Sequence, residues 1–361
     1  GFTMRIKIDK FANINNVDLE FSNQMNILIG DNGTGKTLLL EAYSKINDTV
    51  ISHLDSKNNF ISSIIDQAKL NIIKISKEGK YELSFTDVLE VENLFNVGIR
   101  KLKDEIEERL KSDVLNENLS MEGLLIEFGN IEELVNFSEE ITVSIGSFSS
   151  DSENDFINIK DSEDYYIELK NKDIGHFRLL DKSSLKKIIK TLNTNPLEDL
   201  LESFKFMISK IIEEKFLFNN NIFNITYIPS ERVYSMSKNL EKIFSETPFL
   251  RYSEQKFMKD YEEAKESKRF VAKFLEENDY TSDEFKELIG GTLNFDDGEV
   301  ISLTDNLGVE IPRELFSTKQ NKLQSLNILE QYQRFPRRSM QYDSRRLLII
   351  EEPEAHLSIK S

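Results

Sequence analysis

The residues best suited to chemistry lie in one short segment near the N-terminus. It matches the P-loop pattern GxxxxGK[ST] with Gly30, Asp31, Asn32, Gly33, Thr34, Gly35, Lys36 and Thr37. Glycine lets backbone N–H groups approach phosphate oxygens without a Cβ in the way. Lys36 would reach the β- and γ-phosphates of a nucleoside triphosphate, and the Thr37 hydroxyl would bind Mg²⁺. The alternative is a glycine turn ahead of a core helix.

Two glutamates far along the sequence could supply the acidic part of such a site. Glu351 and Glu352 follow the apolar run 347–350. Glu351 would bind the hydration shell of Mg²⁺. Aspartate is usual at this position, and the glutamate side chain, which is one methylene longer, favours a contact with the metal through a water molecule. Glu352 is the candidate general base that would polarise an attacking water. An ordinary solvated strand end is the alternative.

The elements that must position the phosphate loop, residues 30–37, follow from periodicity. Apolar alternation at 6–8 and 17–21 predicts two half-buried strands with a turn at 13–16. The apolar run 25–29 is typical of a strand buried on both faces. From Thr37 onward apolar residues recur at helical spacing. The loop is therefore expected between a strand and a helix.

The rest of the chain reads as alternating helices and strands. We predict a hairpin at 70–85, helices at 99–110 and 197–212, strands at 141–145 and 165–169, a strand at 221–228, a charged helix at 254–280, a hairpin turning at 297–298, a helix capped near Ser317, and a buried strand at 347–350. The fold class is therefore α/β. Residues 1–86 and 222–361 are expected to form one discontinuous domain, and residues 87–221 an insertion of helices and strands.

Composition narrows the classes of protein to consider. The 361 residues carry a net charge of −18 and contain no cysteine. Disulfides, cysteine metal sites and thiol catalysis are therefore excluded, and attraction of the whole chain to nucleic acid is not supported. The apolar runs are shorter than a membrane span, so we expect a cytoplasmic protein with no membrane partner. The arginines at 334–346 form either a solvated loop or a phosphate-contact patch.

Two stretches resemble a known family. "IDKFANINNVDLEF…NILIGDNGTGKTLLLEA" followed by "LLIIEEPEAHL" is similar to the ABC-type ATPase heads of the SMC, RecF and OLD (overcoming lysogenisation defect) group. "EEPEAHL" and "ITYIPSER" most resemble the OLD-like branch. The resemblance implies a P-loop NTPase of ABC-ATPase type, with a mixed sheet and an antiparallel β lobe. It also implies ATP and Mg²⁺ bound between two heads arranged head to tail.

The resemblance extends to individual residues. In such heads a signature loop, with a serine and glycines at a helix start, touches the γ-phosphate held by the other subunit. Ser317 would cap its helix and touch phosphate, but Lys319 stands where the family has glycine. Lys319 either adds positive charge or blocks close approach, and an ordinary capped helix is the alternative. His356 would lie in the loop that reaches across the dimer. The loop at 230–232 can approach the site, with Arg232 in a structural salt bridge or at the nucleotide.

The biological role is implied by the resemblance alone. It indicates a homodimer or higher oligomer in which ATP closes two heads and hydrolysis opens them. This switch would control a DNA-processing or nuclease effector in phage defence or DNA maintenance, and DNA is a candidate partner. A regulatory ATP-binding clamp with little hydrolysis is the second hypothesis. The predicted sheet ends at Ser361 without its last strands, so we expect a longer protein whose further part can include a nuclease domain.

Overall fold

The structure is a computed structural model that describes part of the chain. The described residues are 5–21, 25–31, 33–55, 60–67, 70–75, 81–85, 88–116, 118–128, 142–147, 165–171, 174–179, 222–230, 250–272, 283–296, 299–321, 323–324 and 345–352. They form two compact units, each described here by itself. Unit 1 holds residues 1–35, 45–223 and 339–345, and unit 2 holds residues 36–44, 224–338 and 346–361. Both mix helices and sheets, as a P-loop ATPase does.

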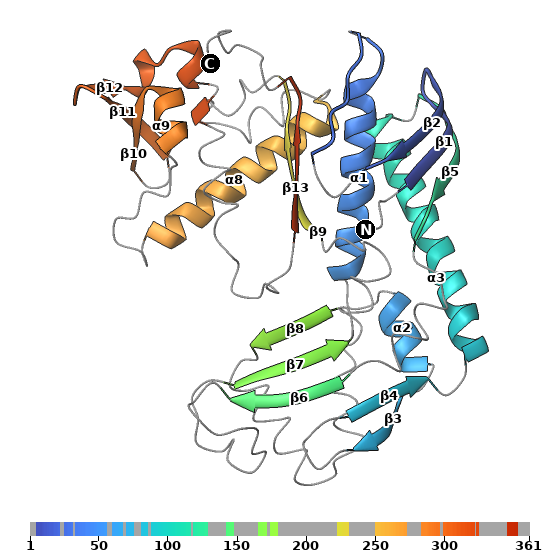
Figure 1. The fold of residues 1–361 in the computed structure, drawn as a ribbon. Coiled ribbons are helices and arrows are strands. Elements are labelled where there is room, and N and C mark those ends of the chain that lie inside the picture. Colours follow the sequence, from blue (N-terminus) through green and yellow to red (C-terminus); the bar gives the residue numbers. More distant parts are fainter. Residues whose placement is uncertain are drawn as a thin grey trace. The chain divides into compact units, whose positions relative to one another are not determined.

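Unit 1 begins with a three-stranded antiparallel sheet in the order β2-β1-β5 (Figure 1). β1 is Arg5–Phe11, β2 is Ile14–Glu20 and β5 is Met121–Ile126. The two predicted N-terminal strands are confirmed, because alternate residues such as Ile6 and Ile8 are buried. The predicted position of the turn is wrong, since β2 already starts at Ile14. β5 was not predicted, and it pairs with β1 although it lies within residues 87–221.

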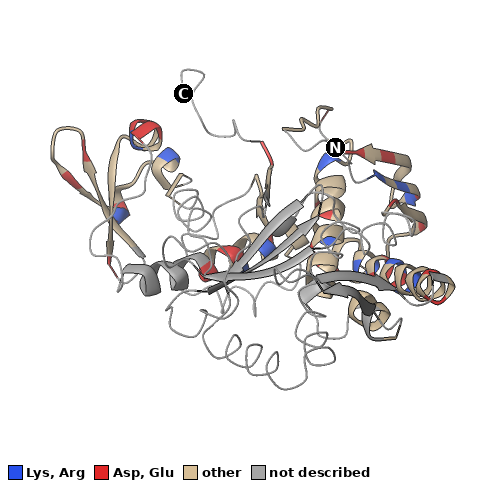
Figure 2. Ribbon diagram, turned by 60° about the horizontal axis from the view of Figure 1, so that its bottom comes forward, with Lys and Arg blue, Asp and Glu red and all other residues tan. Residues whose placement is uncertain are grey.

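Three helices accompany this sheet along the chain. α1 is Lys36–Asp55, α2 is Phe60–Gln67 and α3 is Val88–Arg109, which continues as a π-helical turn at Leu110–Val114. The predicted helix after the phosphate loop is confirmed as α1. α3 confirms the helix predicted at 99–110, although it begins earlier. Charges of both signs alternate along α3 (Figure 2), while its Leu102 and Ile106 are fully buried.

Unit 1 also contains a five-stranded antiparallel sheet in the order β3-β4-β6-β7-β8. Its strands are β3 (Leu70–Ile75), β4 (Tyr81–Phe85), β6 (Thr142–Ser147), β7 (Tyr165–Asn171) and β8 (Ile174–Leu179). The hairpin predicted at 70–85 and the strands predicted at 141–145 and 165–169 are confirmed. β8 was not predicted. The helix predicted at 197–212 lies outside the described residues.

The described residues of unit 2 form several elements besides the first turns of α1. In chain order they are β9 (Ile222–Ile228), α8 (Tyr252–Ala272), α9 (Asp283–Ile289), β10 (Gly291–Asp296), β11 (Glu299–Asp305), β12 (Glu310–Pro312), the 3-10 turn Arg313–Leu315, and β13 (Arg345–Ile350). β10, β11 and β12 form one antiparallel sheet, and β13 pairs with β9. These elements confirm the strand predicted at 221–228 and the hairpin predicted around 297–298. α8 confirms the charged helix predicted at 254–280 as far as Ala272, and the rest of that range lies outside the described residues. α9 and β12 were not predicted. Among the described helices, none is long and apolar enough to cross a membrane.

The core of unit 2 joins α8 to the β10-β11-β12 sheet. Its buried residues are Ile228, Leu250, Phe257, Met258, Tyr261, Ile289, Leu293, Val300, Leu303, Phe316 and Leu323. Phe257 and Tyr261 stack on one face of α8 with their ring centroids 6.2 Å apart. The cluster includes Phe316, so the residue just before the predicted signature serine is anchored in the core.

The strand predicted at 25–29 is wrong. Residues 25–31 form no strand, and the side chains of Met25 and Ile29 are 85% and 87% exposed. A strand needs a neighbour that supplies ladder hydrogen bonds, and no described strand pairs with this segment. The strand at 347–350 forms as part of β13 but is only half buried, because Leu348 and Ile350 are 46% and 39% exposed.

Candidate functional site

The phosphate loop adopts a conformation that requires glycine at two positions. Gly33 and Gly35 have φ angles of +82° and +90°, in the left-handed region that other residues avoid. A Cβ at Gly35 would also lie 2.4 Å from Cδ1 of Ile14. Between the glycines, the Thr34 N–H and hydroxyl both donate to the Asp31 carbonyl, at 3.4 and 2.8 Å. The loop therefore has a defined turn, with Gly30, Asp31, Gly33 and Thr34 exposed.

The start of α1 is suited to an anion. Lys36 is the first residue of this 20-residue helix, and the first turn contains no acidic residue. The first N–H groups of a helix lack intrahelical partners, and the helix dipole places partial positive charge there. Lys36 and Thr37 are both partly exposed. Together these features fit the phosphate groups of a nucleotide.

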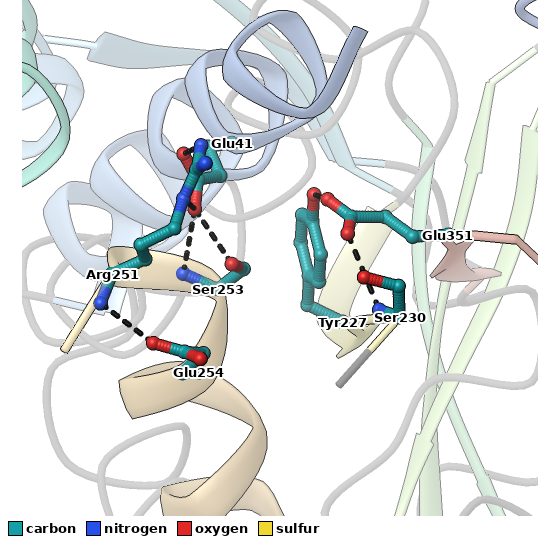
Figure 3. A network of polar contacts seen from close by, with 7 residues as sticks. All are labelled: Glu41, Tyr227, Ser230, Arg251, Ser253, Glu254 and Glu351. Carbon is teal, nitrogen blue, oxygen red and sulfur yellow. Dashed lines mark hydrogen bonds and ion pairs between the residues drawn. The ribbon is translucent and has the colours of Figure 1, made fainter. Parts of the chain in front are cut away.

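Glu351 lies just beyond the end of β13 and is held by β9 (Figure 3). Its Oε1 accepts a hydrogen bond from the Tyr227 hydroxyl at 2.5 Å, and its Oε2 accepts one from the Ser230 N–H at 3.3 Å. Its own N–H donates to the Ile228 carbonyl at 2.9 Å. The side chain is 7% exposed, and a buried carboxylate needs such donors. Ser230, in the loop after β9, therefore contacts Glu351, and the approach of this loop to a nucleotide stays a prediction.

Glu352, the next residue, is exposed and has a left-handed backbone. Its φ is +44°, a value that is uncommon for a residue other than glycine, asparagine or aspartate. Such a conformation costs about 1–3 kcal/mol and is often found at functional sites. The chain therefore buries one carboxylate, that of Glu351, and turns sharply to present the next one to solvent.

Glu41, on the second turn of α1, is a buried carboxylate that holds the start of α8 (Figure 3). It accepts hydrogen bonds from the Arg251 guanidinium at 2.7 and 3.2 Å, and from the Ser253 N–H and hydroxyl at 3.2 and 2.6 Å. Glu254 accepts the Arg251 N–H at 2.9 Å, which is one half of a capping box. Glu41 thus does for α8 what an N-cap side chain normally does.

Glu41 and Glu351 both raise the pKa values of two buried or half-buried side chains, those of Tyr227 and Arg251. Burial, and then the charge of Glu351, raises the pKa of the Tyr227 phenol, and Glu41 adds to this effect. The hydrogen bond to Glu41 raises the pKa of the Arg251 guanidinium, and the charge of Glu351 contributes. The first turns of α1 and the end of β13 both belong to unit 2. Lys36 and Thr37 belong to the same turns.

The donor set in unit 2 fits Mg²⁺ only as a companion of phosphate. No group of three or more potential ligands gathers anywhere in the described ranges. Mg²⁺ keeps several waters and needs only one or two protein ligands when phosphates supply others. The Thr37 hydroxyl and the Glu351 carboxylate are the two that the sequence predicts. They would serve a nucleotide-bound Mg²⁺, and they do not form a site for the free ion.

The predicted signature loop contains a complete capping box. The Ser317 hydroxyl accepts the Gln320 N–H at 3.2 Å, and the Gln320 side chain accepts the Ser317 N–H at 2.9 Å. The prediction that Ser317 caps its helix is therefore confirmed, and its contact with phosphate stays a prediction. Lys319 lies between these two residues and is partly exposed.

Two substitutions separate the roles of Ser317. Ser317→Ala should lower the free energy of unfolding by about 1 kcal/mol, because the cap is lost. Ser317→Asp keeps a capping oxygen and should leave stability within about 0.5 kcal/mol, yet its charge would repel a phosphate and reduce ATP turnover. Denaturant unfolding and a phosphate-release assay measure both. Normal turnover of the aspartate variant would contradict the signature role.

The remaining predicted residues are placed as follows. Asn32, Arg232, His356 and the arginines of the predicted cluster at 334–338 lie outside the described residues. Arg345 and Arg346, the other two arginines of that cluster, begin β13, so the loop predicted there is wrong for them. His53, on α1, packs on Phe60 with the ring centroids 5.5 Å apart. Three residues of the site were missed: Glu41, Tyr227 and Arg251. A charged residue on the buried side of α1 and a tyrosine inside an apolar strand were the available signals.

A search of curated proteins finds RecF proteins from several bacteria that are similar to part of this chain. The chain is similar to DNA replication and repair protein RecF of Haemophilus influenzae strain 86-028NP, with 33% identity over 99 residues, or 27% of this chain and 24% of that protein. The RecF of Leptospira interrogans is 28% identical over 207 residues, 53% of each chain. The RecF of Mannheimia succiniciproducens is 55% identical over 38 residues, covering 10% of this chain and 11% of that protein. No family model and no solved structure matches.

These matches establish a weak homology at modest identity over part of the chain. This chain spans about a quarter of the Haemophilus relative and about half of the Leptospira relative. The resemblance to RecF is therefore confirmed as a weak homology over part of the chain, and the resemblance to the OLD-like branch stays a prediction.

Proposed function

We propose that this chain is an ATPase head that binds and hydrolyses ATP in DNA maintenance. One structural observation carries the proposal: the phosphate loop forms a defined turn, with Gly33 and Gly35 at φ angles of +82° and +90°, directly before the first turn of the 20-residue helix α1. Exposed N–H groups at such a helix start, together with Lys36, suit the phosphates of a nucleotide. The relatives named for DNA replication and repair support the DNA-maintenance role.

Each residue has a defined part in the proposed reaction. Backbone N–H groups of the loop and the Lys36 ammonium bind the β- and γ-phosphates. The Thr37 hydroxyl and Glu351 hold the metal shell, Glu351 through water. Mg²⁺, when bound, neutralises charge on the phosphates. Glu352 accepts a proton from a water molecule while the water oxygen bonds to the γ-phosphorus. The bond between the γ-phosphorus and the oxygen that bridges it to the β-phosphate breaks, which yields ADP and inorganic phosphate.

The proposed assembly is a head-to-tail dimer. The Ser317 loop and His356 of a second copy would complete each nucleotide site, and ATP would close the two heads. This switch would act on an effector that processes or cuts DNA, in the manner implied by the OLD-like branch and its role in phage defence. Residues 1–86 and 222–361 would form the head and residues 87–221 the insertion, with β5 contributing to the β1 sheet.

A second candidate function is an ATP-dependent clamp with little hydrolysis. It is favoured by the partly exposed Lys319, which stands where the resembled family has glycine. Activity would then reside in a partner or a further domain. Turnover measured with and without DNA separates the two functions. Rapid turnover in either condition rules out the clamp.

The primary test is Lys36→Ala. A hydrogen bond to a charged group contributes about 1.5–3 kcal/mol, so the ATP dissociation constant should rise about 10- to 100-fold. Titration calorimetry in the presence of Mg²⁺ measures it directly. Lys101→Ala, an exposed lysine on α3, is the matched control and should bind like the wild type. Unchanged affinity of Lys36→Ala would reject the site.

A further inference from the structure

Tyr227 is a fully buried residue of β9 that carries a polar hydroxyl group. Ile225, Thr226, Tyr227 and Ile228 of β9 are all buried, and Tyr227 is 0% exposed. A buried phenol needs a hydrogen-bond partner, because an unsatisfied polar group costs about 1–3 kcal/mol. The partner here is the Glu351 carboxylate, at 2.5 Å. Since phenylalanine would fill the same space, the hydroxyl itself requires an explanation.

β9 and Ser230, two residues beyond its end, hold Glu351 at three points. The Tyr227 hydroxyl and the Ser230 N–H each donate to one carboxylate oxygen. The Glu351 N–H donates to the Ile228 carbonyl, which fixes its backbone. Two donors on two different oxygens determine the plane in which the carboxylate lies. This arrangement leaves little freedom for the side chain to rotate.

A carboxylate has more acceptor positions than these two donors use. It accepts about four hydrogen bonds, and Tyr227 and Ser230 supply two of them. The Arg251 guanidinium is hydrogen-bonded to Glu41 in the same unit. We expect Glu351 to use a further acceptor position for a water of the nucleotide-bound metal.

We propose that Tyr227 is a positioning residue that orients Glu351 toward the water shell of nucleotide-bound Mg²⁺. This inference rests on the proposed ATPase function and adds a residue to it. Tyr227 touches neither nucleotide nor metal and acts through Glu351 alone. Outer partners that orient a metal-site carboxylate typically contribute about 10- to 100-fold in metal affinity or activity.

The test is Tyr227→Phe, with binding as the readout. A fluorescent ATP analogue that resists hydrolysis is titrated into each protein in EDTA and then at rising Mg²⁺ concentration. Tyr227→Phe should bind the metal-free analogue like the wild type. The Mg²⁺ concentration that gives half of the metal-dependent gain should rise about ten-fold. Tyr252→Phe, which loses a hydroxyl contact to Ser44 in the same unit, should leave this concentration unchanged.

The outcomes distinguish the two proposals. A wild-type protein that binds no analogue overturns the ATPase function together with this inference. A wild type that binds, beside a folded Tyr227→Phe with unchanged Mg²⁺ dependence, overturns the inference alone. Thermal unfolding shows whether each variant is folded.

A double variant keeps the test decisive if Tyr227→Phe does not fold. Tyr227→Phe combined with Glu351→Gln leaves no buried carboxylate without its donor. It should match Glu351→Gln alone in Mg²⁺ dependence, because Tyr227 acts only through the carboxylate. A further ten-fold loss in the double variant would show that Tyr227 acts independently, which overturns the inference.

Discussion

Replacing Glu352 by glutamine should stop ATP turnover while ATP stays bound. Glutamine keeps the size of the side chain and removes the base, and a positioned general base contributes about 10²- to 10⁴-fold. Glu352 is exposed at the end of β13, so the substitution should leave the free energy of unfolding within about 0.5 kcal/mol. Phosphate release measures the turnover, and calorimetry measures the retained affinity. If two heads close around ATP, the variant should also accumulate as a dimer in gel filtration.

A suitable control is the neighbouring glutamate. Glu351→Gln should lower the affinity for Mg²⁺ and reduce stability, because Glu351 is buried and bonded to β9, whereas Glu352→Gln should do neither. Normal phosphate release by Glu352→Gln would remove it as the base.

Replacing Glu41 by alanine should destabilise the protein by about 2–4 kcal/mol. It removes charge-assisted hydrogen bonds worth about 1.5–3 kcal/mol and a helix cap worth about 1 kcal/mol. The expected loss of stability is lower than the full sum of these contributions, because the Arg251 side chain is 52% exposed and can form hydrogen bonds to water once Glu41 is removed. Denaturant unfolding followed by circular dichroism gives the value.

Two further variants sharpen the Glu41 result. Glu41→Gln keeps an oxygen for Ser253 and should lose about half as much stability as the alanine variant. Glu108→Ala removes an exposed glutamate of α3 and should change stability by less than about 0.5 kcal/mol. A loss at Glu41 no larger than that at Glu108 would mean that the α8 cap contributes nothing.

Sequence patterns predicted the elements whose signals are local. The phosphate loop and α1, the hairpin β3-β4 and the cap at Ser317 each depend on residues a few positions apart. The strand at 25–29 was wrong because an apolar run shows only that a strand is possible, while ladder partners lie elsewhere in the chain. β5 was missed because "MEGLLI" contains a glycine and alternates poorly, and only its pairing with β1 makes it a strand.

In the candidate site, too, residues with a local sequence signal could be predicted, and residues defined by long-range contacts could not. Lys36, Glu351 and Glu352 were predicted from motifs. Tyr227 bonds a residue 124 positions away and Arg251 a residue 210 positions away, and no local pattern encodes such pairs. A tyrosine in the apolar strand 222–228 suggested a polar partner, yet it could not identify Glu351.

The left-handed backbone of Glu352 has an evolutionary consequence. A glycine or asparagine there would relieve strain that costs about 1–3 kcal/mol, so heat resistance and the carboxylate make opposite demands on one position. A library selected only for heat resistance should become enriched in those two residues at position 352. Variants recovered from such a selection would be more thermostable and would lack the proposed general base.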